Sequence, residues 1–194
     1  MRYIKINAES NGSHLNQNGG FIDEEGWAII PENMCIPSNF PFVNIIVENG
    51  VVISMTNGVL PPVDITVLQN KKIKQMSEQC RSVIISGIIF NDERYSLEIE
   101  DQLNLMSLIE DVKNGATQVP YHANGENCRF YTAQEFTELV DACTRYKIYH
   151  ESYYNSLRNY INNLTTEEEI NNIFYGINIP EEYQTEVLKA LLSE

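Results

Sequence analysis

The spacing of hydrophobic residues along the chain changes at about residue 60. Before this point, apolar and polar residues alternate over short runs, which is typical of β-strands. After it, apolar residues recur every three or four positions, which predicts amphipathic helices. Asn57-Gly58 and Pro61-Pro62 lie at the change and end the strand pattern. The sequence therefore predicts an α+β fold, in which a small β-rich docking domain over residues 1–63 precedes a helical bundle or helical hairpin with one long helix.

The β-rich part has one strong local signal, at residues 43–56. Two β-branched runs are joined there by Asn49-Gly50, the pair best able to adopt the positive φ angles of a type I′ turn. These residues predict a β-hairpin. The other predictions for this part are short strands at residues 3–6 and 27–30, a loop at residues 11–20 and an irregular connection at residues 34–42.

Two long helices are predicted in the second part, over about residues 64–87 and from Thr132 onwards. Thr132 and Glu135 form a capping box, in which the hydroxyl accepts the amide hydrogen three residues on and the carboxylate reaches back. A stripe of residues spaced by seven, interleaved with further apolar residues, covers about four heptads; its members are Phe136, Cys143, His150, Leu157 and Leu164. This helix is expected to pack against earlier helices of the same chain. The alternative is a dimeric or trimeric coiled coil.

Residues 64–164 make up the predicted helical domain, and residues 165–194 are predicted as a C-terminal helical segment. Thr166 and Glu169 form a second capping box, followed by helical residues up to Gly176. Pro180 is expected at the first position of a last amphipathic helix, where its missing amide hydrogen is tolerated.

The stretch from Glu93 to Met106 is the centre of the helical domain. Ser96 stands at the N-cap position of a helix predicted to run to about Lys113, because its hydroxyl can accept an amide hydrogen of the first turn. Apolar residues cover more than one side of this helix, so we expect it to be buried on two faces. Acidic residues in its first turns suit the helix dipole. They are Glu98, Glu100 and Asp101.

Polar side chains on and near this helix are expected to hold the structure together rather than to bind a substrate. The amides of Gln102 and Asn104 are predicted to hydrogen-bond the backbone of a neighbouring loop. Three arginines are predicted to pair with the carboxylates of the helix. They are Arg81, Arg94 and Arg129.

The charge balance limits the classes of partner. Thirteen basic residues against 27 acidic ones give a formal net charge of -14, which repels nucleic acid and anionic membrane surfaces. No apolar run reaches the roughly 18 residues of a membrane span, and we expect synthesis in the cytoplasm without membrane insertion. Four scattered cysteines and three scattered histidines indicate free thiols, and we expect neither a metal site nor a cofactor.

Catalytic candidates are few. The acidic cluster of Glu98, Glu100, Asp101 and Glu110 could suggest an enzyme acting on carbohydrate or peptidoglycan. Helical spacing argues against it, because Glu98 and Asp101 could share a face but Glu100 points elsewhere. Cys143 and His150 lie about 10 Å apart on one helix, too far for a nucleophile and its base. No nucleophile elbow, P-loop or dinucleotide-binding motif is present in the sequence. We therefore expect no catalytic residue.

Tyrosine is enriched in the later part of the long helix. Because a tyrosine ring can be buried while its hydroxyl stays hydrated, these residues are a candidate interface. The alternative is that the rings belong to the core. The five residues are Tyr146, Tyr149, Tyr153, Tyr154 and Tyr160.

The central stretch also carries a family resemblance. A tyrosine-serine pair precedes an acidic-glutamine-x-asparagine-leucine run, and a Thr-Ala-x-Glu helix start follows some thirty residues later. In these features, residues 68–162 resemble a small domain of unknown function that recurs in tail-fibre and tail-associated proteins of bacteriophages and prophages. The motif residues are Arg94, Tyr95, Ser96, Glu100, Asp101, Gln102, Asn104 and Leu105.

The resemblance implies a non-enzymatic structural protein of a phage tail or of a phage-tail-like bacteriocin. It also implies synthesis in the bacterial cytoplasm and a place in the virion tail or tail-like particle. The expected partners are other tail, baseplate or fibre proteins, and the chain itself could form a homo-oligomer. The resemblance transfers no catalytic residue. A tail-fibre assembly chaperone that does not stay in the mature particle is the alternative function.

Overall fold

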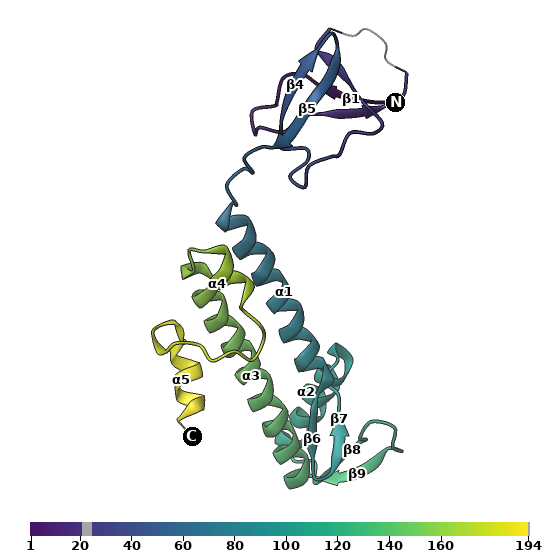
Figure 1. Ribbon diagram of the computed structural model, residues 1–194. Coiled ribbons are helices and arrows are strands. Elements are labelled where there is room, and N and C mark those ends of the chain that lie inside the picture. The colour runs from purple at the N-terminus through teal and green to yellow at the C-terminus, as the bar shows by residue number, and fades with distance from the viewer. Residues whose placement is uncertain (21–24, 194) are drawn as a thin grey trace. The chain divides into compact units, whose positions relative to one another are not determined.

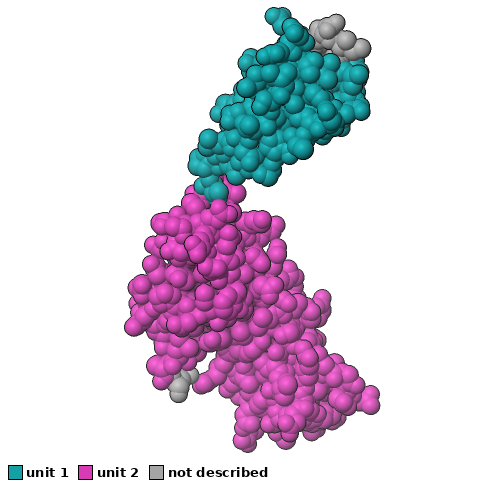
Figure 2. Space-filling view, in the orientation of Figure 1, with its two compact units in different colours: residues 1–63 teal, residues 64–194 magenta. Residues whose placement is uncertain are grey.

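The computed structural model describes residues 1–20 and 25–193. The chain forms two compact units, residues 1–63 and residues 64–194 (Figure 2). The predicted α+β fold is confirmed, because a five-stranded sheet in the first unit is followed by helices that include one of 31 residues. Residues 165–194, predicted as a segment of their own, lie within the second unit.

The described residues of the first unit form a sheet in the order β2-β1-β3-β5-β4 (Figure 1). β3 and β5 pair in parallel and the other neighbours are antiparallel. Alternate apolar side chains from these strands make the core of the unit, with Ile4 and Val52 fully buried. The strands are β1 (Arg2–Lys5), β2 (Asn16–Asn18), β3 (Trp27–Ile30), β4 (Val43–Glu48) and β5 (Val51–Asn57).

The predicted hairpin is confirmed. β4 and β5 are joined by Asn49 and Gly50, whose φ angles of 49° and 75° are both positive. The predicted loop at residues 11–20 is wrong in one part, because residues 16–18 form the edge strand β2. This strand is the polar tripeptide Asn-Gln-Asn, which has no alternation of apolar residues. Its pairing depends on backbone hydrogen bonds to β1, which a hydrophobic pattern does not report.

In the second unit, α1 (Ile65–Ser86) packs antiparallel to α3 (Ala133–Asn163) (Figure 1). Near the start of α1, the amide of Gln69 donates to the carbonyl of Leu164. Near its end, the hydroxyl of Tyr146 donates to the carbonyl of Val83. The long helix therefore packs within its own chain, as favoured from the sequence.

The two long helices start with side-chain caps, of which only the one at Thr132 was predicted. Asp64 caps α1 by accepting the amide hydrogen of Thr66 at 2.9 Å. Thr132 caps α3 by accepting the amide hydrogen of Glu135 at 3.2 Å. The other half of the predicted box is not formed, because the Glu135 carboxylate accepts from Arg129 instead, at 2.9 Å. An ion pair with a nearby guanidinium has taken the side chain away from the helix end.

The remaining elements of this unit are short. Directly after Gly87, the strands β6 and β7 form a short antiparallel hairpin. Pro180 does not open a helix, because it precedes a 3-10 turn (η1), and the last helix begins six residues later with Thr185 as its cap. The elements are β6 (Ile88–Phe90), β7 (Glu93–Tyr95), α2 (Ile99–Lys113), β8 (Gln118–Tyr121), β9 (Arg129–Thr132), α4 (Glu167–Asn171), η1 (Glu181–Tyr183) and α5 (Glu186–Leu192).

The capping box of Thr166 and Glu169 is confirmed, although α4 ends at Asn171 rather than near Gly176. Lys72 of α1 donates to the carbonyls of Asn171 and Ile173, which satisfies acceptors at this helix end.

The second unit has two hydrophobic clusters along α3. One surrounds the first half of α3 and contains the two small hairpins, with Phe136 and Leu139 fully buried. The other surrounds the second half and the C-terminal elements, with Leu157 and Ile161 fully buried. α2 packs on the first cluster through a single buried residue, Leu105.

Candidate interaction site

The central motif has a different local structure from the one predicted. α2 begins at Ile99, and Glu98 rather than Ser96 is its N-cap. The backbone amide of Glu98 donates to Asp101 Oδ2 at 3.3 Å, and the Ser96 hydroxyl donates to the same oxygen at 2.6 Å. Ser96 therefore acts two residues before the cap, by orienting the carboxylate that receives the first amide. The acid at Asp101 has a structural role at the helix start.

Loop residues outside the motif support this arrangement. The side-chain oxygen of Asn124 accepts the backbone amide hydrogen of Ser96 at 3.0 Å. The backbone amide of Asn124 donates to the carbonyl of Arg94 at 2.7 Å. Tyr95 and Leu97 are both buried. The motif thus alternates between buried apolar residues and polar residues that bind the 123–124 loop.

The prediction that this helix is buried on two faces is wrong. Ile99, Leu103 and Met106 are 58%, 60% and 68% exposed. Their spacing of four and three residues places them in one row on α2, and we call this row the α2 stripe. The other face of α2 packs on the core through Leu105, with Leu108 and Ile109 half-buried. The helix is therefore peripheral, with a second apolar face that the described chain leaves open.

Two hollows lie beside the α2 stripe. The hollow between α2 and α3 has a volume of about 290 Å³ and includes Met106, Ile109 and Val140 in its walls. The hollow between α1, α2 and α3 has a volume of about 320 Å³ and includes Ile84 and Ile99. Three polar residues line both hollows. They are Gln102, Lys147 and Glu151.

A hydrogen-bonded bridge separates the two hollows. The ammonium of Lys147 on α3 donates to Gln102 Oε1 at 2.7 Å and lies 4.0 Å from the Glu151 carboxylate. Gln102 Nε2 donates to the carbonyl of Leu97 at 2.7 Å, as predicted for a motif amide. Asn104 is exposed, so the same prediction does not hold for it. The two hollows and the α2 stripe form one surface, which we call the α2 groove.

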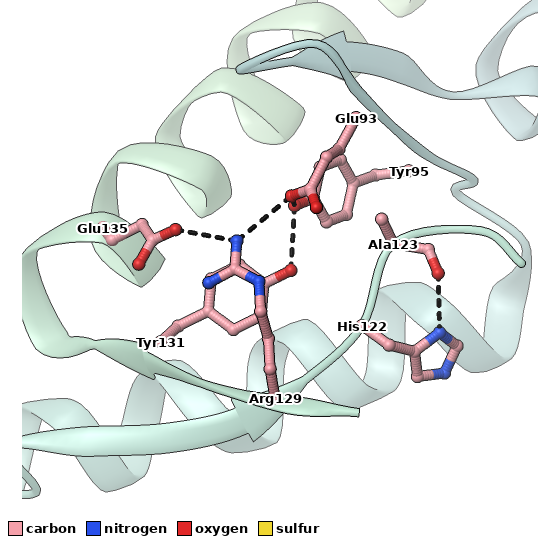
Figure 3. Close-up of polar contacts among 7 residues, drawn as sticks. All are labelled: Glu93, Tyr95, His122, Ala123, Arg129, Tyr131 and Glu135. Atoms are coloured by element: carbon pink, nitrogen blue, oxygen red, sulfur yellow. Dashed lines mark hydrogen bonds and ion pairs between the residues drawn. The ribbon is translucent and has the colours of Figure 1, made fainter. Parts of the chain in front are cut away.

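One motif residue, Tyr95, belongs to a polar cluster with Glu93, Arg129, Tyr131 and Glu135 (Figure 3). Arg129 donates to Glu93 at 3.1 Å and to Glu135 at 2.9 Å, and its guanidinium lies 3.6 Å from the centre of the Tyr131 ring. The Tyr95 hydroxyl donates to Glu93 at 2.7 Å and lies 2.9 Å from the Tyr131 hydroxyl. Because Tyr95 gives its only hydrogen to Glu93, Tyr131 donates to Tyr95.

These contacts shift the pKa values of the cluster. Hydrogen bonds from Tyr95 and then from Arg129 lower the pKa of the Glu93 carboxyl. The pKa of Tyr95 is raised, first by burial and then by its hydrogen bond with Tyr131. Through Glu93, Arg129 and Glu135, the cluster joins β7 and β9 to the start of α3.

The predicted pairing of arginines with α2 is wrong. Arg129 contacts Glu93 and Glu135, which belong to β7 and α3. Arg94 donates to the carbonyl of Ser86 at 3.2 Å, at the end of α1. Arg81 is exposed in the wall of the second hollow. Arg94 lies on β7, which pairs with β6, and Arg129 lies on β9, which pairs with β8. These pairings direct both side chains to elements other than α2.

The five tyrosines of the candidate interface are buried or half-buried in the second unit. Tyr153 donates to the carbonyl of Ile177 at 2.7 Å and accepts the amide hydrogen of Gly176 at 2.9 Å. The Tyr160 ring stacks on Tyr183, with 5.1 Å between centroids. Tyr146, Tyr149 and Tyr154 pack against the two hydrophobic clusters. Their rings thus contact other parts of the same chain.

Cys143 and His150, the residues considered as a nucleophile and its base, both lie in packed surroundings. Cys143 is buried, and burial raises the pKa of its thiol to about 11, so the thiol is protonated at neutral pH. His150 contacts the Tyr175 hydroxyl through Nδ1 at 3.1 Å, and burial lowers its pKa. All four cysteines are free thiols. Within residues 1–20 and 25–193, no three His, Cys, Asp or Glu side chains gather where they could hold a metal ion.

No helix of the described chain is both long enough and apolar enough to cross a membrane. Comparisons with protein-family models, with curated proteins and with solved structures gave no match. The residues and their geometry are therefore the basis for a functional interpretation. The α2 groove escaped prediction although its signal was present, since the spacing of Ile99, Leu103 and Met106 marks an apolar row.

Proposed function

We propose that this chain is a non-enzymatic structural protein of a phage tail or phage-tail-like particle, and that it acts by binding other proteins. The observation that carries the proposal is the α2 groove. A helix of a small unit places three large apolar side chains in solvent beside two hollows. Exposed apolar surfaces of this kind are typical of interaction sites.

The resemblance of residues 68–162 to a domain of tail-associated proteins supports the particle context. The same motif that carries this resemblance contains the first residues of α2 and one wall of the groove. Asp101 and Gln102 of the motif are used to start α2 and to bridge it to α3. In this proposal, the motif builds a binding surface, and its acids have no catalytic task.

The proposal is tested in the parent particle. Mass spectrometry of purified particles is expected to detect the protein at a constant ratio to a major tail protein, in wild-type preparations washed at high salt. Abundance in the lysate together with absence from particles would contradict it, and would favour the fibre-assembly chaperone. Loss of a lytic activity after alanine substitution of Glu98 and Asp101, with the fold intact, would instead favour an enzyme.

A further inference from the structure

We propose that the α2 groove binds an amphipathic helix of a partner protein, one that carries Lys or Arg on both sides of its apolar row. This inference deepens the proposed function, because it names the surface and the chemistry of the partner.

The shape of the α2 groove favours a helix. Ile99, Leu103 and Met106 follow the i, i+4, i+7 spacing by which helices contact one another. Hollows of about 290 and 320 Å³ lie on either side of the bridge between Gln102 and Lys147. Side chains one or two turns apart on a partner helix can enter both hollows while its backbone lies along the α2 stripe.

The charge around the α2 groove favours a basic partner. Residues 98–113 hold five carboxylates and one cationic side chain, Lys113, which already contacts Glu110 at 3.4 Å. Glu98 and Glu100 are exposed at one end of the stripe, and Glu151 lines both hollows. Lys147 is occupied by Gln102 and Glu151. Among the described residues that line the groove, Arg81 and Lys147 are the basic ones.

The same charges disfavour binding of a second copy of this chain in the α2 groove. Two α2 helices packed face to face would bring ten carboxylates together with two lysines, twice the content of residues 98–113. Like charges across an interface weaken association and suppress wrong partners. A partner helix with flanking Lys or Arg instead makes favourable contacts with the exposed carboxylates of Glu98 and Glu100.

The test uses the full chain and three fluorescent synthetic peptides. The first is an amphipathic helix with leucine at i, i+4 and i+7 and lysine on both flanks, the second has glutamate in place of lysine, and the third has the first composition in scrambled order. In fluorescence anisotropy, the first is expected to bind about tenfold or more tighter than either of the others. The scrambled peptide measures the non-specific attraction of lysine to an acidic protein.

Two variants locate the binding surface. Leu103→Glu is expected to weaken binding of the first peptide about tenfold or more, although the added negative charge attracts lysine. Val187→Glu adds the same charge at a residue of α5 that is 51% exposed, and should leave binding unchanged. Both sites are exposed, so circular dichroism should show the wild-type fold. Tighter binding of the glutamate peptide, equal binding of the scrambled one, or equal effects of both variants would overturn the proposal.

Self-association is measured on the same samples. In sedimentation velocity, we expect no dimer that depends on Leu103. A wild-type dimer that the Leu103→Glu variant fails to form would assign the groove to a second copy of the chain. Failures of the two proposals remain distinguishable. Peptide binding by a protein absent from particles contradicts the tail function alone, whereas a particle protein that binds none of the peptides contradicts the helix-binding inference alone.

Discussion

At the scale of single residues, the central stretch begins with a carboxylate, Glu93, that two donors share. Glu93 Oε2 accepts from both Tyr95 and Arg129, and Arg129 continues to Glu135. Hydrogen bonds to an ionised acceptor are stronger than those between neutral groups. This cluster connects β7, β9 and the start of α3, so its loss should loosen the N-terminal end of the long helix.

Tyr95→Phe tests the polar cluster. The substitution removes one hydroxyl, leaves the buried Tyr131 hydroxyl without its acceptor and deprives Glu93 of a donor. We expect it to lower the free energy of unfolding by about 1–3 kcal/mol in chemical denaturation. Tyr3→Phe is the matched control, because the Tyr3 hydroxyl is also on a buried residue but donates only to the sulfur of Met1 at 3.7 Å. Equal decreases in the free energy of unfolding for the two variants would contradict a stabilising role of the cluster.

The same variant has a consequence for pH dependence. Because the folded-state pKa of Glu93 is lowered, its carboxylate stabilises the fold above the unfolded-state pKa, and this contribution is lost as pH falls through the folded-state pKa. In Tyr95→Phe, the pKa of Glu93 should rise toward its ordinary value, which a carboxyl titration by NMR measures. The decrease in the free energy of unfolding that protonation of Glu93 causes at low pH should then be smaller than in the wild type.

At the scale of elements, the position of α2 depends on the junction between α1 and β6. Gly87 ends α1 with a φ angle of 75°, and the backbone of Tyr95 and Ser96 passes directly against it. A Cβ atom at Gly87 would lie 1.8 Å from the carbonyl oxygen of Tyr95. Close packing of two backbones at this point therefore brings the motif onto the end of α1.

Gly87→Ala is expected to lower the free energy of unfolding by about 2–5 kcal/mol, from a strained φ angle together with a backbone clash. Gly115→Ala separates the two causes, because Gly115 has a φ angle of 101° but nothing within 4 Å of an added Cβ. This control should cost about 1–2 kcal/mol in the same denaturation experiment. A Gly87 variant no less stable than the Gly115 variant would show that the two backbones can move apart freely.

At the scale of the whole molecule, each unit has a hydrophobic core of its own. Ile4 is fully buried in the first unit and Leu157 in the second. Each substitution of these residues by alanine removes a large buried side chain, at a cost of about 2–5 kcal/mol. We expect Ile4→Ala and Leu157→Ala to lower different transitions in differential scanning calorimetry. A single transition lowered equally by both variants would contradict this expectation.

Local patterns predicted most of the elements, because the signals act between residues that are close in sequence. Asn49-Gly50 can adopt positive φ angles whatever surrounds it, and it joins β4 to β5 as expected. Asp64 and Thr132 bond amides two or three residues away, so the starts of α1 and α3 need no tertiary context. The heptad spacing similarly predicted the apolar row of α3.

Only the tertiary structure decided which apolar faces are covered and which polar groups meet. Periodicity shows that Leu103 and Leu105 lie on different sides of α2, but both sides are apolar, and only packing against α3 shows that Leu103 is the one left exposed. The partners of Arg129 depend in the same way on the β6–β7 and β8–β9 hairpins, which bring residues 93 and 129 together. The sequence by itself determined the two long helices and the turn of the β4–β5 hairpin, since their hydrogen bonds are local. The α2 groove is a consequence of long-range packing.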